Sequence, residues 1–166
     1  MITIMGIDPG SRRTGFAIIR SSAHRLEHIS HGVIVLNEKQ DLPLRLRELG
    51  SNLSELLTKY RPQIVVIEKI FLGKNADSAF KLGHARGVAT YEACKAGSEV
   101  IEYSTREVKK GITGRGAADK LQVRSALEVY LRLTKIQHLD ASDALALAVF
   151  HAGRMTHLAR MKESEL

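Results

Sequence analysis

The sequence has few of the residues that mark secreted, membrane-spanning or disordered proteins. Its 166 residues include one cysteine, Cys94, so no disulfide can form within the chain and no cysteine cluster can hold a metal ion. No secretory signal is visible at the start, and the longest apolar run, residues 144–150, is too short to span a bilayer. With three prolines and no low-complexity tract, nothing suggests disorder. We therefore expect a reducing cytoplasmic setting, no membrane partner, and a small core residue at Cys94.

Acidic residues are fewer than basic residues in this chain. Lysine and arginine number 25 against 18 aspartates and glutamates, which gives a formal net charge of +7. Such an excess favours polyanionic partners, nucleic acid above all. The apolar fraction of 44% is enough for the core of one domain of this length. We expect a single domain over residues 1–166, with a tail that frays from about residue 161.

Apolar runs along the chain alternate between strand and helix patterns. Tight turns between the early runs indicate antiparallel pairing, and leucines at helical spacing fill the segment between Asp41 and Pro62. The predicted strands cover residues 2–8, 14–20, 29–36, 64–67 and 99–103. The predicted helices cover about 42–60, 77–95, 118–133 and 142–160, with a basic helix-and-loop segment before residue 116. This order predicts an α/β domain whose mixed five-stranded sheet is flanked by helices.

Acidic side chains stand at points where strands end or a helix begins. Asp8 closes the first strand before a Pro-Gly turn, and Glu68 follows the apolar run 64–67. Asp140 and Asp143 lie three residues apart near the start of the last helix, so they share one face. Each has an ordinary explanation as a turn residue, a solvent-facing residue or a helix cap.

Together, these acids suggest a metal-dependent site. Ligand sites of open α/β sheets gather at the carboxyl ends of strands, where Asp8 and Glu68 can meet if their strands are neighbours. Four carboxylates in one cleft repel one another unless a cation compensates. Oxygen ligands without cysteine or histidine favour Mg²⁺, with Mn²⁺ as a substitute, over zinc. Two such ions, about 4 Å apart, would activate water against a phosphodiester. In a basic protein this pattern indicates a nuclease.

The chain resembles the RuvC family of crossover junction endodeoxyribonucleases, the bacterial Holliday junction resolvases. The resemblance runs over nearly the whole chain, with the motifs in the family's order and spacing. It rests on the segments GIDPGSRRTG (6–15), IEKIF (67–71), KNADSA (74–79), KLGHARG (81–87), VKKG (108–111), KLQV (120–123) and DASDALA (140–146).

Membership of that family would give the chain a ribonuclease H-like fold and a defined activity. The resemblance implies that the metal-binding catalytic carboxylates are Asp8, Glu68, Asp140 and Asp143. It implies a homodimer that makes symmetric paired nicks in a four-way DNA junction, in recombination and repair, and leaves 5′-phosphate ends. It also implies a branch-migration helicase as partner, and it places Lys109 and Lys120 near the scissile phosphate as catalytic residues.

A basic stretch and one aromatic residue are predicted to contact DNA. Between residues 104 and 137 there are eight basic and three acidic residues, with glycines that let the backbone approach phosphate. Phe71 follows Glu68 closely and could stack on a base, although a core position is the alternative. The predicted DNA-binding residues are Phe71, Lys74, Lys81, Arg86, Arg106, Lys109, Lys110, Arg115 and Lys120.

One face of the helix after Asp77 has only small residues. Ala79, Gly83 and Gly87 are four residues apart, and glycine within a helix costs about 1 kcal/mol relative to alanine. A close contact on this face would explain them. The sequence leaves open whether that contact is a dimer interface or the sheet.

Three other functions compete with junction cleavage. An ATP-binding domain of the actin and sugar-kinase type also opens with a strand, an acid and a glycine hairpin, but it needs a second lobe. A DNA-binding module without catalysis would explain the basic stretch but not the position of Glu68. A ribonuclease H-like enzyme acting on RNA–DNA hybrids would share the carboxylates, so only its substrate would distinguish it.

Overall fold

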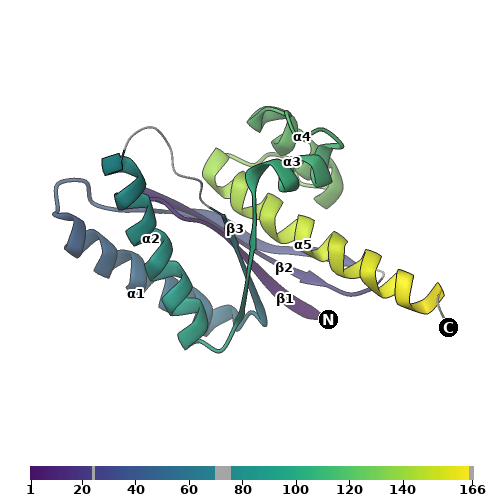
Figure 1. The fold of residues 1–166 in the computed structure, drawn as a ribbon, viewed down its shortest axis with the longest axis horizontal. Coiled ribbons are helices and arrows are strands. Elements are labelled where there is room, and N and C mark those ends of the chain that lie inside the picture. The colour runs from purple at the N-terminus through teal and green to yellow at the C-terminus, as the bar shows by residue number, and fades with distance from the viewer. Residues whose placement is uncertain (24, 70–75, 165–166) are drawn as a thin grey trace.

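The computed structural model describes residues 1–23, 25–69 and 76–164, with side chains as far as residue 157. Its strands form one sheet in the order β3-β2-β1-β4-β5 (Figure 1). β1 (Ile2–Asp8), β2 (Arg13–Ser21) and β3 (Leu26–Val35) are antiparallel neighbours, whereas β4 (Ile64–Glu68) and β5 (Glu99–Tyr103) run parallel to β1. The predicted mixed sheet of five strands is confirmed.

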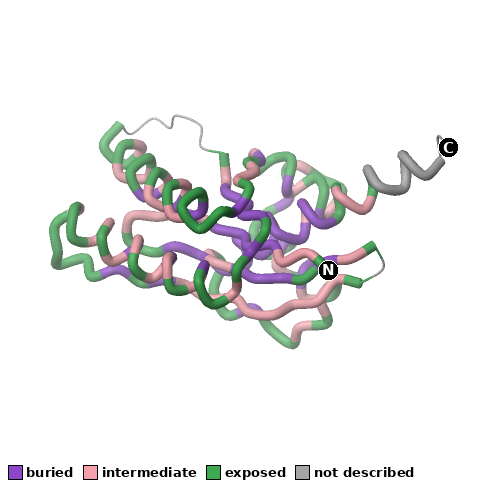
Figure 2. Tube along the Cα trace, turned by 90° about the horizontal axis from the view of Figure 1, so that it is seen from below, coloured by how far each residue is buried: buried purple, intermediate pink, exposed green. Residues whose placement is uncertain are grey.

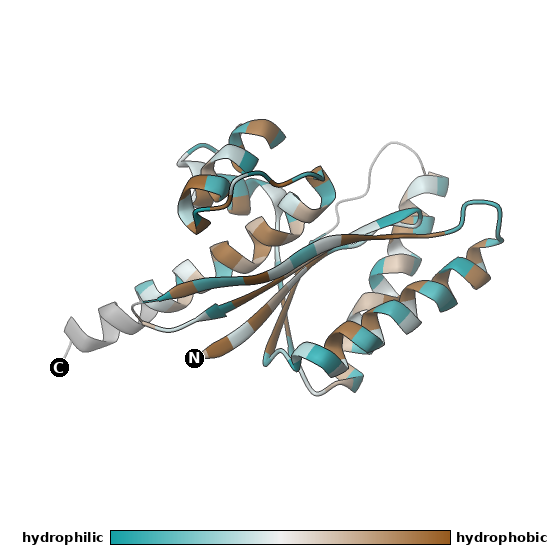
Figure 3. Ribbon diagram, turned by 180° about the vertical axis from the view of Figure 1, so that it is seen from behind, coloured by the Kyte–Doolittle hydropathy of each residue, from teal (hydrophilic) through white to brown (hydrophobic). Residues whose placement is uncertain are grey.

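Helices cover both faces of this sheet. α1 (Leu42–Tyr60) and α2 (Ala76–Lys95) pack on one face, and α3 (Thr105–Thr113), α4 (Lys120–Leu131) and α5 (Leu139–Ser164) lie on the other (Figure 1). Each face has its own hydrophobic core, and buried residues are concentrated between the helices and the sheet (Figure 2). The central strands are largely hydrophobic, while α1 alternates hydrophobic and hydrophilic residues along its length (Figure 3).

Strand alternation decides which side chains face α5. In β1, Ile4 joins the core beneath α5, whereas Met5 and Ile7 join the core beneath α1 and α2. The side-chain period of two therefore directs Asp8 to the α5 face. The same alternation in β4 places Val66 under α5, so Glu68, two residues further on, has the same direction.

α5 approaches the sheet closely because two glycines leave room for it. A Cβ added to Gly15 would overlap the carbonyl oxygen of Asp140, and one added to Gly6 would overlap that of Ala144. Alanines of α5 are buried against β1 and β2 in the same way. Small residues on both sides thus bring the start of α5 onto the strands that carry the acids.

Several details differ from the sequence predictions. α5 begins at Leu139, three residues before the predicted start, so Asp140 is in its first turn. The helix, predicted to end near residue 160, continues to Ser164. Cys94 is exposed, not in the core; its neighbour Ala93 takes the buried position. Among the described residues, no helix is long and apolar enough to cross a membrane.

Candidate active site

The first two acids meet at the carboxyl ends of neighbouring strands. β1 and β4 pair in parallel with Ile7 opposite Ile67, so the next residue on each strand is an acid. Asp8 and Glu68 are therefore side by side, on the α5 face of the sheet, as the sequence predicted. The strand register alone brings together two residues sixty positions apart.

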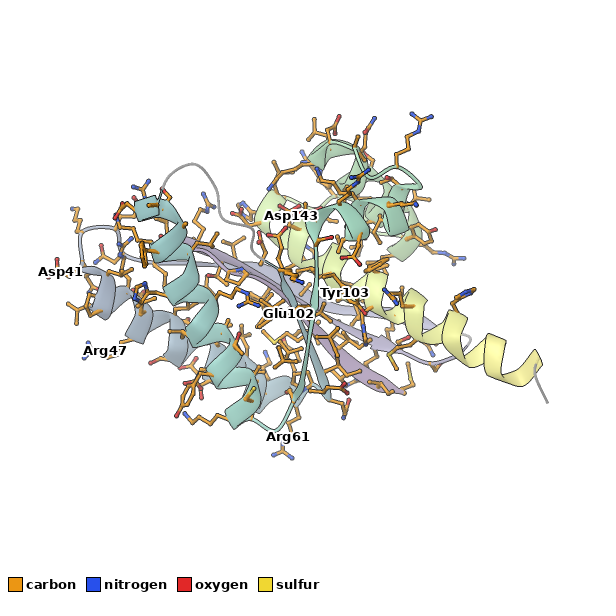
Figure 4. The ribbon with its side chains drawn as sticks, viewed as in Figure 1. Asp41, Arg47, Arg61, Glu102, Tyr103 and Asp143 are labelled. Atoms are coloured by element: carbon orange, nitrogen blue, oxygen red, sulfur yellow. The ribbon has the colours of Figure 1, made fainter. Side chains whose placement is uncertain are left out.

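The other two acids reach the same place from α5. Asp140 lies against Gly15, which pairs with Asp8 across β1 and β2. One helical turn later, Asp143 faces the ends of the strands, and its Oδ2 is ion-paired with Nζ of Lys120 (Figure 4). Asp140 forms its own ion pair with Arg13 at 3.4 Å, between Nε and Oδ2.

A cavity of about 290 Å³ opens between these elements. Three of the four predicted acids line it, and so do both predicted catalytic lysines; Asp140 lies just outside. The remaining walls come from α3, α4 and α5. The lining residues are Asp8, Glu68, Thr105, Val108, Lys109, Lys120, Val123, Asp143, Ala146 and Leu147.

The cavity concentrates negative charge around Asp8. The pKa of Asp8 is raised to about 8, chiefly by burial and further by the neighbouring Glu68 and Asp143 carboxylates, with Lys120 acting in the opposite direction. Burial disfavours the charged form of Lys120, yet its hydrogen bond to Asp143 and the nearby carboxylates raise its pKa overall. Ionising Asp8 is thus unfavourable in this cavity, and the positive charge of Lys120 offsets only part of that cost.

The donor set fits a hard divalent cation. Asp8, Glu68, Asp140 and Asp143 offer only carboxylate oxygens, which suit Mg²⁺ or Mn²⁺. The raised pKa of Asp8 supports a cation independently of the donor chemistry, because a cation there would stabilise the ionised carboxylate that the protein alone disfavours. Within the described ranges, no three such ligands are already grouped to hold a metal ion; Glu68, Asp140 and Asp143 instead bond to Thr105, Arg13 and Lys120.

The predicted DNA-binding residues fall on two helical regions. Phe71 and Lys74 lie outside the described residues. Lys81 on α2 pairs with Asp77 at 2.5 Å. Arg86, also on α2, is tied to Glu68 and Glu102. Lys109 and Lys120 line the cavity. Together with them, the others are on α3, the loop that follows it and the start of α4: Arg106, Lys109, Lys110, Arg115 and Lys120.

Sequence reasoning missed two side chains that contact the acids. The hydroxyl of Thr105 donates a hydrogen bond to Oε1 of Glu68, and Arg13 pairs with Asp140. The pattern Ser104-Thr-Arg-Glu107 signals a helix start, where the capping box is indeed formed. Nothing in that pattern reveals that Thr105 points at an acid 37 residues earlier in the chain.

Comparisons with known proteins agree with this geometry. The family model for crossover junction endodeoxyribonuclease RuvC matches residues 4–151. The protein of that name from Bdellovibrio bacteriovorus is 56% identical over 163 residues, 98% of this chain and 97% of its own length. That from Citrifermentans bemidjiense is 46% identical over 149 residues, 90% of this chain and 91% of its own.

Solved structures give the same result. Thermus thermophilus RuvC in complex with Holliday junction substrate matches with a TM-score of 0.87 and 26% identity, covering 95% of this chain and 96% of that one. Thermus thermophilus RuvC alone matches with a TM-score of 0.83 and 27% identity, covering 93% and 96%. The chain belongs to the RuvC family of crossover junction endodeoxyribonucleases.

Proposed function

We propose that this protein resolves four-way DNA junctions by hydrolysing one phosphodiester bond in each of two opposed strands. The observation that carries the proposal is the cavity in which Asp8, Glu68 and Asp143 face two lysines. The similarity to a RuvC bound to Holliday junction substrate supports DNA as the polymer. A basic α3 and α4 beside the cavity fit a polyanionic substrate.

Nucleases of this family depend on a metal ion, and we propose two Mg²⁺ ions per site. Asp8, Glu68, Asp140 and Asp143 would hold them. The ions would supply an activated water and a stabilised leaving oxygen. The chain itself contributes the two lysines: Lys109 and Lys120, on the cavity wall, neutralise charge that grows on the phosphate during cleavage.

We also propose that α2 forms the homodimer interface. The residues that α2 buries toward the sheet are Ala85, Ala89 and Ala93, whereas Cβ atoms added to Gly83 or Gly87 would meet no neighbour within 4 Å in the part of the chain that the structure describes. The sheet therefore does not explain these glycines. An apolar groove of about 880 Å³ runs along this face, and the side chains beside it, Phe80 and Tyr91, are 71% and 64% exposed.

A homodimer would turn one site into two, related by a twofold axis, as paired nicking requires. Phe80→Glu should make the protein monomeric by analytical ultracentrifugation and convert paired nicks to single nicks. Val129→Glu is the control, because Val129 is equally exposed but on α4. A Phe80→Glu variant that remains dimeric would exclude this face.

The test of the activity is a cleavage assay with Mg²⁺ on a mobile four-way junction, a linear duplex and an RNA–DNA hybrid. Paired symmetric nicks in the junction alone, abolished by Asp8→Asn with binding retained, are the expected result. Cleavage of the hybrid instead would support the proposed active site but would identify the RNA–DNA hybrid as its substrate. Binding without cleavage under any divalent ion would leave a DNA-binding module.

Two further features stay predictions. The partnership with a branch-migration helicase rests on family membership, and co-sedimentation with that complex on a junction would test it. A cytoplasmic location follows from a DNA substrate inside the cell, and fractionation would test it.

A further inference from the structure

Glu68 is held at both its carboxylate and its backbone by side chains of other elements. It is the last residue of a five-residue strand, and the next residue, Lys69, donates its backbone N–H to the carbonyl of Tyr103 on β5. Two side chains from other elements contact it directly. The Thr105 hydroxyl donates to its carboxylate, and Nε of Arg86 donates to its carbonyl oxygen at 3.3 Å.

Thr105 is well placed to orient a carboxylate. It is the first residue of α3, whose start is fixed by the capping box of Ser104 and Glu107, and α3 is anchored by its buried Val108. The hydroxyl lies at the wall of the active-site cavity and engages Oε1 of Glu68. A hydrogen bond to one carboxylate oxygen leaves the other free to bind an ion, in the manner of an outer-shell partner.

Arg86 fixes the main chain of the same residue. Its guanidinium spans from the carbonyl of Glu68 to the carboxylate of Glu102 on β5, so that it ties α2 to both strands. Figure 4 shows Glu102 on the strand that passes between α2 and α5. Only 25% of the Arg86 side chain is exposed, and both of its contacts are to the protein. This geometry suits support of the site better than contact with a phosphate.

We propose that Thr105 and Arg86 are positioning residues for Glu68: Thr105 sets the direction of its carboxylate, and Arg86 holds its backbone at the end of β4. The inference deepens the proposed function and rests on it. Their removal weakens the affinity of the site for its metal ion, because Glu68 must then be ordered when the ion binds. The binding of junction DNA does not depend on either contact.

Thr105→Val tests the first half, because it removes the hydroxyl and keeps the shape. We expect the Mg²⁺ concentration for half-maximal cleavage to rise about tenfold or more, with kcat at saturating Mg²⁺ little changed. Without DNA, Mn²⁺ binding measured by calorimetry should weaken by a similar factor. Thr105→Ser should restore both values. Thr156→Val is the control, since its hydroxyl bonds the carbonyl of Ala152 on α5, away from the cavity.

Arg86→Met tests the second half against the earlier prediction of a DNA contact. If Arg86 positions Glu68, the variant should weaken Mn²⁺ binding and leave the salt dependence of junction binding unchanged. If Arg86 contacts a phosphate, the variant should reduce the slope of junction affinity against salt concentration by about one and leave Mn²⁺ binding intact. Glu102→Gln, which alters only the far partner, should reproduce part of the Mn²⁺ effect.

The outcomes separate this inference from the proposed function. Normal Mn²⁺ binding and Mg²⁺ dependence in Thr105→Val, or a serine variant no better than valine, would overturn the role of Thr105. A reduced salt slope with normal metal binding would overturn that of Arg86. If wild type fails to cut junctions or Asp8→Asn still cuts them, the proposed function itself fails; Mn²⁺ binding without DNA still reports on Glu68.

Discussion

The two halves of the active site are built differently. Asp8, Asp140 and Asp143, here called the helix half, lie where α5 rests on the strands at Gly6 and Gly15, and Asp140 and Asp143 also form ion pairs. Glu68, the strand half, is brought to the site by the register of β4 against β1 and is then held by hydrogen bonds from side chains of α2 and α3. Close-packed backbone has little freedom to shift, whereas a hydrogen-bonded carboxylate can be released by removing one group.

Mutations in the two halves are therefore expected to have different effects. Changes at the glycines on which α5 rests should damage the fold and the chemistry together, because the same contacts serve both. Changes around the strand half should alter metal affinity with less effect on the fold. Four measurements probe the contrast, beginning with the largest expected effect.

Lys120→Met removes the cation that pairs with Asp143 of the helix half. Loss of one such group that stabilises transition-state charge reduces cleavage by about 10²–10³-fold. Single-turnover cleavage at saturating Mg²⁺ measures it. Lys39→Met, at an exposed turn far from the cavity, is the matched control and should cut at the wild-type rate. A loss below tenfold for Lys120→Met would remove this lysine from the chemistry.

Gly15→Ala pushes the start of α5 away from β2, because its Cβ has no room beside the carbonyl of Asp140. Overpacking of this kind costs about 1–3 kcal/mol, and we expect cleavage to fall about tenfold as Asp140 shifts. Urea unfolding and the cleavage assay measure the two effects. Gly153→Ala, a residue of α5 itself whose added Cβ meets nothing within 4 Å among the described residues, should stabilise the helix by up to about 1 kcal/mol. Equal stabilities for both variants would contradict close packing at Gly15.

The pH dependence of stability tests the charge of the helix half. The pKa of Asp8 is raised to about 8, so in EDTA the folded state holds a proton that the unfolded state loses near pH 4. The contribution of Asp8 to the free energy of unfolding should therefore be greatest below pH 4, and it should be lost as the pH rises to 8. Asp8→Asn lacks this loss and should be the more stable protein at pH 8. Parallel stability curves would contradict the raised pKa.

Ser104→Ala gives the smallest effect and acts on the strand half. It removes the cap that fixes the start of α3 beside Thr105, at a cost of about 1 kcal/mol. We expect a threefold rise or less in the Mg²⁺ requirement. Asp41→Ala is the control, because Asp41 occupies the N-cap of α1 without a side-chain cap bond and should cost less. Thermal unfolding with Mg²⁺ titration measures both; equal costs would indicate that the Ser104 cap contributes nothing.

Local patterns explain why much of the fold could be predicted. The β-branched run 64–67 and the leucines of residues 42–60 carry the periods of their own elements, and Pro62 ends α1 after Arg61, which takes a left-handed conformation. The start of α5 was predicted three residues late because no strong cap precedes Leu139. Cys94 was misplaced because the helical phase that buries Ala93 depends on where α2 meets the sheet.

The element order, the acids at the strand ends and the basic segment beside them could be predicted from the chain, because each is a property of neighbouring residues. The packing of whole elements set β4 beside β1 with Ile7 opposite Ile67, which brings Asp8 next to Glu68, and turned Arg13 toward Asp140. It alone decided that Thr105 and Arg86 hold Glu68. Such contacts join residues far apart in the chain, and they depend on how whole elements pack, which no local pattern encodes.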